Sequence, residues 1–306
     1  MGEVIVVAGA TGNLGERIVR ELLSKGAEVR ALVRSSSDAG KVNMLENSGV
    51  KVFKVNLLNA GEVALACQGA SCVVSALAGL RDVIVDTQKV LADAAVLAGV
   101  PRFIPSDYCL DFTNLRDGQN RNLDERREFQ QYIDKLPIAA TSIFNGPFMD
   151  LLTGPMPMIL FKYKRILYWG NADQSIDFTT MDDTAAFTAN AALDSSSPRF
   201  LKIAGEQISA RQMAVILSEV SGHHFKLFKA GGLGLLNLLI KVARTISPAE
   251  KELYPAWQGM QYMRDMFEGR ARISHYDNDR YPGMHWTGLN KCFQSKRFLQ
   301  SANKWF

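Results

Sequence analysis

The feature that most constrains this chain is an apolar run that enters a glycine-rich turn within its first fifteen residues. Residues 4–8 read Val-Ile-Val-Val-Ala, and Gly9, Gly12 and Gly15 follow before apolar residues at helical spacing. This order predicts a buried strand, a tight turn and a helix. The free amides of the first helical turn then form a site for a dinucleotide pyrophosphate, assisted by the helix dipole.

Each glycine of the turn has its own role in that prediction. Gly9 permits the tight turn, Gly12 lets the backbone approach the phosphates, and Gly15 lets the helix pack close to the strand. Because glycine turns are common, the strand–turn–helix context carries the prediction, and a turn without a cofactor is the alternative. The turn residues predicted to contact the cofactor are Gly9, Thr11, Gly12, Asn13, Leu14 and Gly15.

Composition narrows the class of protein. With 306 residues the chain can bury a substantial core, in one large domain or two closely joined lobes. Its 35 basic and 31 acidic residues give a net charge of +4 without any run of like charge, so no nucleic-acid partner is expected. The four cysteines show neither a CxxC pair nor zinc spacing, so we expect free thiols and no metal site.

Targeting signals are not evident. The first strand begins close to the N-terminus and leaves no room for a signal peptide, so a cytoplasmic location is expected. The longest apolar run, about residues 233–242, falls short of the roughly 20 residues needed to cross a bilayer. We expect this run to form a buried helix or the wall of a binding cleft, and we expect no membrane partner.

Strands and helices alternate through the first half of the chain. The predicted strands are residues 4–8, 28–33, 51–55, 71–75, 103–105 and 138–144. The predicted helices between them are residues 38–47, 60–67, 83–98 and 122–135. This alternation predicts an α/β fold, a Rossmann-type doubly wound parallel sheet whose ligands gather at the carboxyl ends of the strands.

The pattern changes after about Asn145. A strand at 176–180 leads into a helix at 181–193, and another strand follows at 200–203. Ser209 and Gln212 then form a capping box for a helix that ends at Gly222. We expect residues 1–150 to form the dinucleotide-binding domain. Residues 151–306 are expected to form a smaller α+β substrate lobe, some of whose elements return to the main sheet.

The choice of nucleotide depends on the end of the second predicted strand. An NAD-specific site usually carries an acidic residue there, but this chain has Arg34 followed by three serines. Arg34 can clamp a 2′-phosphate with help from Ser35 and Lys41, which favours NADP(H) over NAD(H). Stacking of Arg34 on the adenine, or its exposure to water, is the alternative. Other residues predicted to contact the cofactor from strand ends are Asn56, Leu57, Ala76, Leu77 and Ser106.

Taken together, these residues resemble the NmrA-like group of atypical short-chain dehydrogenase/reductases, which includes isoflavone-reductase-like enzymes. The resemblance covers about residues 3–222. It rests on residues 9–15, Val33-Arg34, residues 102–108, residues 145–148 and residues 177–185. It implies a Rossmann-type sheet, NADP(H) binding and a small C-terminal substrate lobe. The group contains both reductases and redox-sensing regulators without catalysis.

The resemblance also places the segment after the sixth predicted strand beside the nicotinamide. It implies cofactor contacts from Asn145 and Phe148, with the Phe148 ring packing against the nicotinamide. An ordinary Asn-Gly turn is the alternative.

Hydride transfer to a carbonyl or an activated alkene needs a proton donor near the developing oxyanion. No tyrosine in this chain has a lysine four residues later, so the Tyr-x-x-x-Lys pair of many short-chain dehydrogenases is absent. Isoflavone-reductase-like enzymes use a lysine on the helix after the fifth strand, where this chain carries Arg126 and Arg127. Arginine can stabilise an oxyanion but is a poor proton donor.

The remaining catalytic candidates are Ser106, Tyr108 and Arg126. Ser106 is expected to hydrogen-bond a substrate oxygen, and Tyr108 to donate a proton if an arginine lowers its pKa. In the alternative reading, Ser106 only turns the chain, Tyr108 lines the cleft, and the arginines pair with Asp124 and Glu128 on the surface.

Two functions follow from these residues. The first is an NADP(H)-dependent oxidoreductase that reduces a small, partly apolar or aromatic carbonyl or enone, favoured by a tail rich in Trp and Met that can form a pocket. The second is an NADP(H)-binding redox sensor that acts without turnover through a regulatory protein partner, favoured by the missing Tyr/Lys pair.

Overall fold

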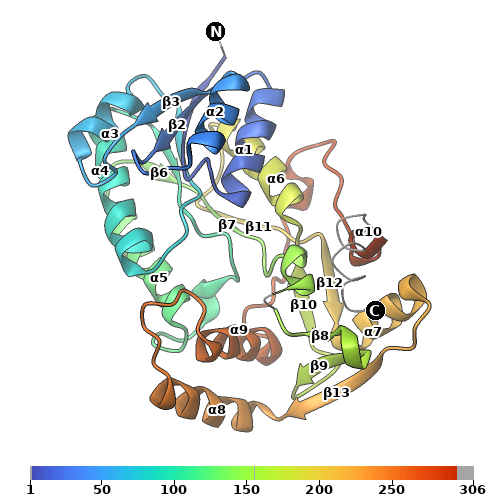
Figure 1. The fold of residues 1–306 in the computed structure, drawn as a ribbon. Helices are drawn as coiled ribbons and strands as arrows, with labels where there is room; N and C mark the ends of the chain where they lie inside the picture. The colour runs from blue at the N-terminus through green and yellow to red at the C-terminus, as the bar shows by residue number, and fades with distance from the viewer. Residues whose placement is uncertain (1, 155, 295–306) are drawn as a thin grey trace.

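A six-stranded parallel sheet forms the centre of the first half of the chain (Figure 1). The computed structural model describes residues 2–154 and 156–294. The strand order is β3-β2-β1-β4-β5-β6. The strands are β1 (Val4–Ala8), β2 (Glu28–Val33), β3 (Lys51–Lys54), β4 (Cys72–Ser75), β5 (Arg102–Ile104) and β6 (Ala139–Ala140). The order reverses beside β1, so the carboxyl ends of β1 and β4 flank the switch point of the sheet.

The central strand is apolar because it is covered on both faces. Val6 is paired with Arg30 of β2 on one side and with Val73 of β4 on the other, and its side chain is fully buried. Ile5 and Val7 point to one face of the sheet and Val6 to the other, and each face has its own apolar cluster.

Helices cover both faces of the sheet, which confirms the Rossmann-type doubly wound fold. The helices on the face of Ile5 and Val7 are α1 (Asn13–Ser24), α2 (Ala39–Asn47) and α6 (Met181–Leu193). The helices on the face of Val6 are α3 (Ala60–Cys67), α4 (Gln88–Leu97) and α5 (Arg121–Ile133). These bounds agree with the predicted ones to within a few residues.

Two predicted elements differ from the structure. Residues 138–144 are not one strand, because Thr141 separates β6 from β7 (Ser142–Phe144). The amide of Thr141 donates to the Phe103 carbonyl, whereas the next amide, of Ser142, donates to the Arg199 carbonyl, so the chain changes its pairing partner there. The predicted helix 83–98 begins as a π-helical segment, Asp82–Thr87, before α4 continues it.

The second half of the chain forms a lobe with its own sheet and core. A three-stranded sheet has the order β13-β9-β8, and β10 pairs antiparallel with β12. The strands are β8 (Ile159–Leu160), β9 (Arg165–Trp169), β10 (Ser175–Phe178), β12 (Glu206–Ser209) and β13 (Lys226–Gly231). The helices are α7 (Ala210–Ser221), α8 (Leu233–Ile246), α9 (Ala256–Glu268) and α10 (Leu289–Gln294), and the capping box of Ser209 and Gln212 is confirmed.

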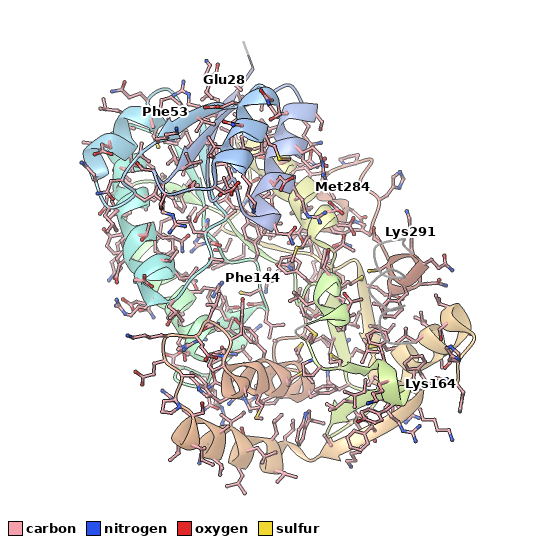
Figure 2. All side chains as sticks on the ribbon, viewed as in Figure 1. Glu28, Phe53, Phe144, Lys164, Met284 and Lys291 are labelled. Atoms are coloured by element: carbon pink, nitrogen blue, oxygen red, sulfur yellow. The ribbon has the colours of Figure 1, made fainter. Side chains whose placement is uncertain are left out.

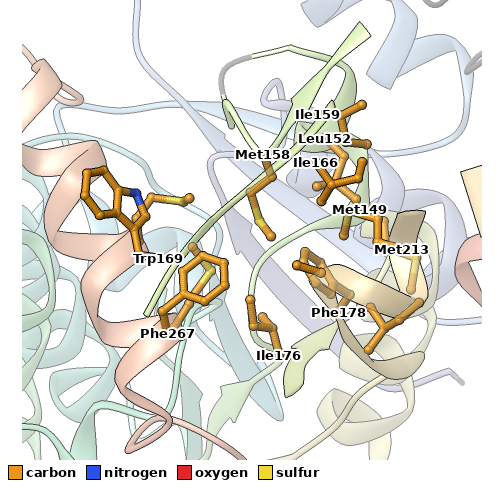
Figure 3. Packing of buried hydrophobic residues seen from close by; sticks show 14 of the residues in the cluster. Met149, Leu152, Met158, Ile159, Ile166, Trp169, Ile176, Phe178, Met213 and Phe267 are labelled. Atoms are coloured by element: carbon orange, nitrogen blue, oxygen red, sulfur yellow. The ribbon is translucent and has the colours of Figure 1, made fainter. Parts of the chain in front are cut away.

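The core of this lobe lies between the small sheets and helices α7 and α9. Figure 3 shows the side chains of Met158, Ile166 and Phe178 together with Phe267 of α9 and Met213 of α7. Sulfur-containing side chains fill irregular space between rigid aromatic rings, which suits a core built from short elements.

The expectation that residues 233–242 are buried is wrong. Within α8 only Leu236 and Ile240 are buried, whereas Leu235 and Leu238 are exposed to solvent. Helix α8 lies at the outer edge of the lobe, packed beside α9 (Figure 1), so one side of it faces none of the residues that the structure describes.

Elements from the second half of the chain pack against the first half, although none of its strands joins the six-stranded sheet among the described residues. Helix α6 packs on α1, and β11 (Phe200–Lys202) pairs parallel with β7. The segment 273–288, named here the C-terminal strap, then runs along these elements. Its contacts are hydrogen bonds from the Ile273 amide and Tyr276 hydroxyl to Asp177, and from the Thr287 amide to Asp183.

The strap also holds Asp194 at the end of α6 through charge. The Arg280 guanidinium lies 2.8 Å from the Asp194 carboxylate, and the Tyr281 hydroxyl donates to the same oxygen at 3.0 Å. Burial raises the pKa of Asp194, but the hydrogen bonds from Ser196, Arg280 and Tyr281 outweigh it and hold the pKa well below its usual range. The folded state therefore favours the charged form.

This pKa shift makes stability depend on pH. Because the folded pKa is depressed, the contribution of Asp194 is complete above its unfolded pKa of about 4 and is lost as the pH falls toward the folded value. We expect the Asp194→Asn variant to show a shallower loss of unfolding free energy below about pH 4 than the parent. Urea titrations over a pH series measure this. The matched control is Asp279→Asn on the same strap, and equal slopes for Asp194→Asn and the parent would contradict the assignment.

Candidate functional site

The glycine turn between β1 and α1 has the backbone geometry that the sequence predicts. Gly9 has a φ of +84°, and a Cβ there would lie 2.6 Å from the Ala76 carbonyl oxygen. A Cβ on Gly15 would collide with the carbonyl oxygen of Gly9. Glycine is therefore required at both positions, since one turns the chain and the other lets α1 approach it.

The first turn of α1 is open. Gly12 occupies the N-cap position and offers no side-chain acceptor. The Gly12 amide donates to Gly9 and the Glu16 amide donates to Gly12, but within the described chain the amides of Asn13, Leu14 and Gly15 have no acceptor. Three free amides at a helix N-terminus, at the switch point of the sheet, form an anion site.

Cationic groups lie beside this turn. The Lys41 amine donates to the Thr11 carbonyl at 3.0 Å, which joins the start of α2 to the glycine turn. Arg34, at the end of β2, is exposed and makes no ion pair among the described residues. The nearby carboxylate of Asp38 caps α2 by accepting from the Lys41 amide at 2.8 Å. Positive charge thus borders the turn.

A groove of about 250 Å³ lies between α1 and α2, next to the same turn. Its walls include Ala10 and Thr11 of the turn, Lys41, and the apolar side chains of Met44 and Leu45. The groove extends the open region around the glycine turn away from the sheet.

Loops after β3 and β4 complete this side of the site. The Asn56 side-chain oxygen accepts from the Leu58 amide at 3.0 Å, and the Asn56 amide donates to Glu62 at 2.8 Å, so Asn56 fixes its own loop. The Ala76 amide continues the sheet by donating to the Ala8 carbonyl at 2.8 Å. Contacts of Asn56, Leu57 and Ala76 with a nucleotide stay predictions.

Ser106 joins three segments at the carboxyl end of β5. Its hydroxyl donates to the Leu77 carbonyl at 2.6 Å, and its amide donates to the Gln88 side chain at 3.0 Å. Its carbonyl accepts from the Arg126 guanidinium at 3.2 Å. Ser106 therefore holds the loop after β4 and the side chain of Arg126 in place.

Arg126 points into the protein instead of pairing on the surface, so the alternative reading is wrong for this residue. Besides Ser106, its guanidinium donates to the Asn122 carbonyl at 2.8 Å. Burial opposes its charge, yet the neighbouring Cys109, Tyr262 and Asp107 favour it, and the pKa of Arg126 is raised. A cation thus sits between the sheet edge and α9. Arg127, by contrast, pairs with Asp124 at 2.8 Å, as the alternative reading expects.

The expectation that an arginine lowers the pKa of Tyr108 is wrong. Tyr108 is buried in the cluster beneath α6, beside Thr188. Burial raises the pKa of its phenol well above the usual value, and Arg126 does not contribute to the shift. Since desolvation stabilises the neutral phenol, Tyr108 resists giving up a proton.

The turn after β7 is tightly fixed. Gly146 has a φ of +64°, and a Cβ there would collide with the Asp177 carbonyl oxygen. Thr179 donates its hydroxyl to the Asn145 carbonyl at 2.6 Å, and Phe148 forms a bridge with Thr179. The Asn145 side-chain oxygen is buried without a hydrogen-bond partner in the described chain, so a ligand N–H would satisfy it.

Sequence reasoning missed a buried polar network that joins α5 to α9. Asn120, the N-cap of α5, donates to Asp265 at 2.7 Å and accepts from Gln258 at 2.7 Å. Arg264 pairs with the same Asp265 at 2.7 Å. Asn120 lies 138 positions from Gln258 and 145 from Asp265, so no local pattern could reveal these contacts. The network fixes α9 against the N-terminus of α5.

The described residues contain neither a metal-binding cluster nor a membrane-spanning helix. Residues 2–154 and 156–294 contain no group of three or more His, Cys, Asp or Glu side chains that could hold a metal ion. Within the same residues, no helix has the length and apolar character needed to cross a bilayer.

The parallel sheet, its switch point and the open N-terminus of α1 together define a Rossmann-type dinucleotide-binding protein. A match to a family model identifies the family within this class. The chain belongs to the NmrA-like family, whose model matches residues 1–258.

Several curated relatives with detectable similarity carry the names of reductases. The chain is 28% identical over 190 residues to the probable pinoresinol-lariciresinol reductase 3 of Arabidopsis thaliana, covering 60% of this chain and 61% of that protein. It is 25% identical to a bifunctional pinoresinol-lariciresinol reductase of Linum album, covering 97% of this chain and 95% of that protein. The first match thus spans about three fifths of the relative.

Solved structures show the same fold. AtPrR2 with NADP+ and (+)pinoresinol superposes with a TM-score of 0.82 at 20% identity, covering 96% of this chain and 98% of that one. The binary complex of leucoanthocyanidin reductase and NADPH from Vitis vinifera gives a TM-score of 0.79 at 16% identity, covering 98% and 99%.

Proposed function

We propose that this protein binds NADP(H) and uses it to reduce a small, partly apolar or aromatic carbonyl or enone. The open first turn of α1 carries the proposal, because three free amides lie at the switch point with Arg34 and Lys41 beside them. The amides of Asn13 to Gly15 would hold the pyrophosphate. Arg34, Lys41 and Ser35 would hold the 2′-phosphate.

The turn after β7 suits the nicotinamide end. The unpartnered oxygen of Asn145 would accept a hydrogen bond from the carboxamide, and Phe148 would pack beside the ring. When bound, the cofactor would supply a hydride to the substrate carbon, and water would supply the proton that completes the reduction. The residues of this turn orient the ring and exclude water from it.

Arg126 is the charged group that we propose to act on the substrate. Its guanidinium lies at the carboxyl end of β5 under α9, held by Ser106 and Asn122. There it would stabilise negative charge that develops on the substrate oxygen. Ser106 acts as a positioning residue in this proposal, because its hydroxyl is engaged with Leu77. Tyr108 has no role as a proton donor in it.

Two kinds of comparison support the reductase class. Relatives in two plant species are named reductases, and two solved neighbours are complexes with NADP+ or NADPH. A redox sensor acting through a protein partner is the second candidate. The burial of Tyr108 favours it, since the phenol that would serve as proton donor is enclosed in the core. The domain boundary at residue 150 and the cytoplasmic location stay predictions.

Turnover separates the two candidates. We expect NADPH to be oxidised with at least one member of a panel of quinones, enones and aldehydes, followed by cofactor absorbance. Arg126→Met should lower kcat by about a hundredfold, the order found for loss of one oxyanion-stabilising donor, while NADPH affinity changes little. Arg116→Met, an exposed arginine in the loop before α5, is the matched control. Cofactor binding without turnover of any compound would overturn the reductase. The sensor would then require different affinities for the oxidised and the reduced cofactor, since equal affinities carry no redox signal.

A further inference from the structure

Helix α8 carries an apolar face that residues 2–154 and 156–294 leave uncovered. Its buried residues, Leu236 and Ile240, belong to the core that includes Met263 of α9. On the other side, the exposed fraction is 57% for Leu238 and 78% for Ile246. Five exposed residues recur at intervals of three and four and therefore share one face, named here the α8 face. They are Leu235, Leu238, Leu239, Val242 and Ile246.

The two segments that form this face and the strands beside it carry only positive charge, and the nearest acidic residues along the chain are Asp173, Glu219 and Glu250. Residues 156–172 and 220–249 contain seven Lys and Arg residues and no Asp or Glu. The seven are Lys162, Lys164, Arg165, Lys226, Lys229, Lys241 and Arg244. The two segments lie together because β13 pairs with β9, and Lys164 lies at the same outer edge of the lobe as β13 (Figure 2).

The net charge of these two segments is larger than that of the whole chain, which is +4. The chain has 35 basic and 31 acidic residues, so outside these two segments it has 28 basic and 31 acidic residues, a net charge of −3. The net positive charge of the protein therefore comes from these two segments. None of the seven cations forms an ion pair with a carboxylate in residues 2–154 and 156–294.

This positive charge indicates which kind of partner can cover the α8 face, a second copy of the chain or an anionic lipid surface. A second copy of the chain would bring the same cations together across a two-fold axis, and like charges at an interface disfavour association. An anionic lipid surface offers phosphates for the cations and acyl chains for the leucines. A helix with an apolar face, cationic flanks and no acidic residue is typical of proteins that lie in a bilayer interface.

We propose that α8 docks this protein on membranes that contain anionic lipids. The α8 face enters the boundary between headgroups and acyl chains, while Lys229 and Lys241 contact lipid phosphates. Helix α8 has 14 residues, so it is about 21 Å long and lies along the surface instead of crossing it. The expectation of no membrane partner rested on the absence of a spanning segment and does not address this mode.

Vesicle flotation tests the proposal with the full chain. We expect it to float with vesicles of phosphatidylcholine and phosphatidylglycerol but not with phosphatidylcholine alone, and to bind less at high salt. The double variant Leu238→Glu/Val242→Glu should lose at least about tenfold in partitioning. Its matched control is Leu65→Glu/Leu97→Glu, which places the same charges at exposed leucines of α3 and α4 and should bind as the parent does.

The electrostatic part is tested separately. Lys229→Gln/Lys241→Gln should lose about tenfold or more in partitioning, whereas Lys25→Gln/Lys135→Gln, with the same change in net charge, should lose little. Retained NADPH binding shows that each variant is folded. Failure of the parent to float with anionic vesicles, or equal losses in test and control variants, would overturn the proposal. An acidic protein would then be the partner to seek.

Discussion

We expect Gly12→Asp to lower NADPH affinity by at least about a hundredfold while the protein stays folded. Gly12 is exposed, its φ is −83°, and a Cβ there would meet only the Gly9 carbonyl oxygen, at 3.2 Å. Aspartate is among the best N-cap residues, so the substitution stabilises α1 by capping its open amides. The same carboxylate occupies the anion site and repels the pyrophosphate. Binding and stability should therefore move in opposite directions.

Isothermal calorimetry with NADPH and thermal unfolding without it measure the two effects. The control is Gly234→Asp, which makes the same change at an exposed glycine in the first turn of α8. That control should leave NADPH affinity unchanged. If Gly12→Asp binds NADPH as the parent does, the pyrophosphate does not lie on α1, and the proposed function loses its main support.

Reversing the charge at Arg34 should change the preference of the protein for NADPH over NADH. We expect Arg34→Glu to weaken NADPH binding by about a hundredfold and NADH binding by far less, since only NADPH carries the 2′-phosphate. Arg34 is exposed and unpaired in the described chain, so its replacement removes no internal contact. Lys41→Gln should have a smaller effect, because its amine is already engaged by the Thr11 carbonyl.

Calorimetry measures the affinities of NADPH and NADH for the parent and for both variants. The ratio of the NADPH affinity to the NADH affinity shows whether the variant has lost its preference for NADPH. Arg116→Glu is the control for the change in net charge, because this exposed arginine lies in the loop before α5. Equal losses of NADPH and NADH affinity in Arg34→Glu would show that the arginine contacts the adenosine and not the 2′-phosphate.

Elements with a strong local pattern were predictable from the sequence. The run from Val4 to Gly15 identifies its strand and turn because apolar burial on both faces and glycine-only geometry leave few alternatives. The capping box of Ser209 and Gln212 is equally local. In each case the determining contacts lie within a few residues of one another.

Features that depend on distant partners were not predictable. Arg126 was expected on the surface in one reading because its own helix offers acidic neighbours, but its partners are Ser106 and Asn122 at the edge of the sheet. Tyr108 follows a strand, and nothing local shows that α6 covers it. The apolar run of α8 resembled a core helix, because a sequence records apolar spacing but not which side has a neighbour.

The packing of α6 on α1 has a consequence for biogenesis. Helix α1 presents Ile18 and Val19 to the cluster that α6 completes through Phe187, and α6 is made only after strands β8, β9 and β10 of the other lobe. A nascent chain that has just finished β7 therefore still exposes part of the interior of its nucleotide-holding half. Until Leu193 leaves the ribosome, the apolar surface of that half stays exposed. Such partly folded chains are prone to aggregation, which chaperones or rapid completion of synthesis prevent.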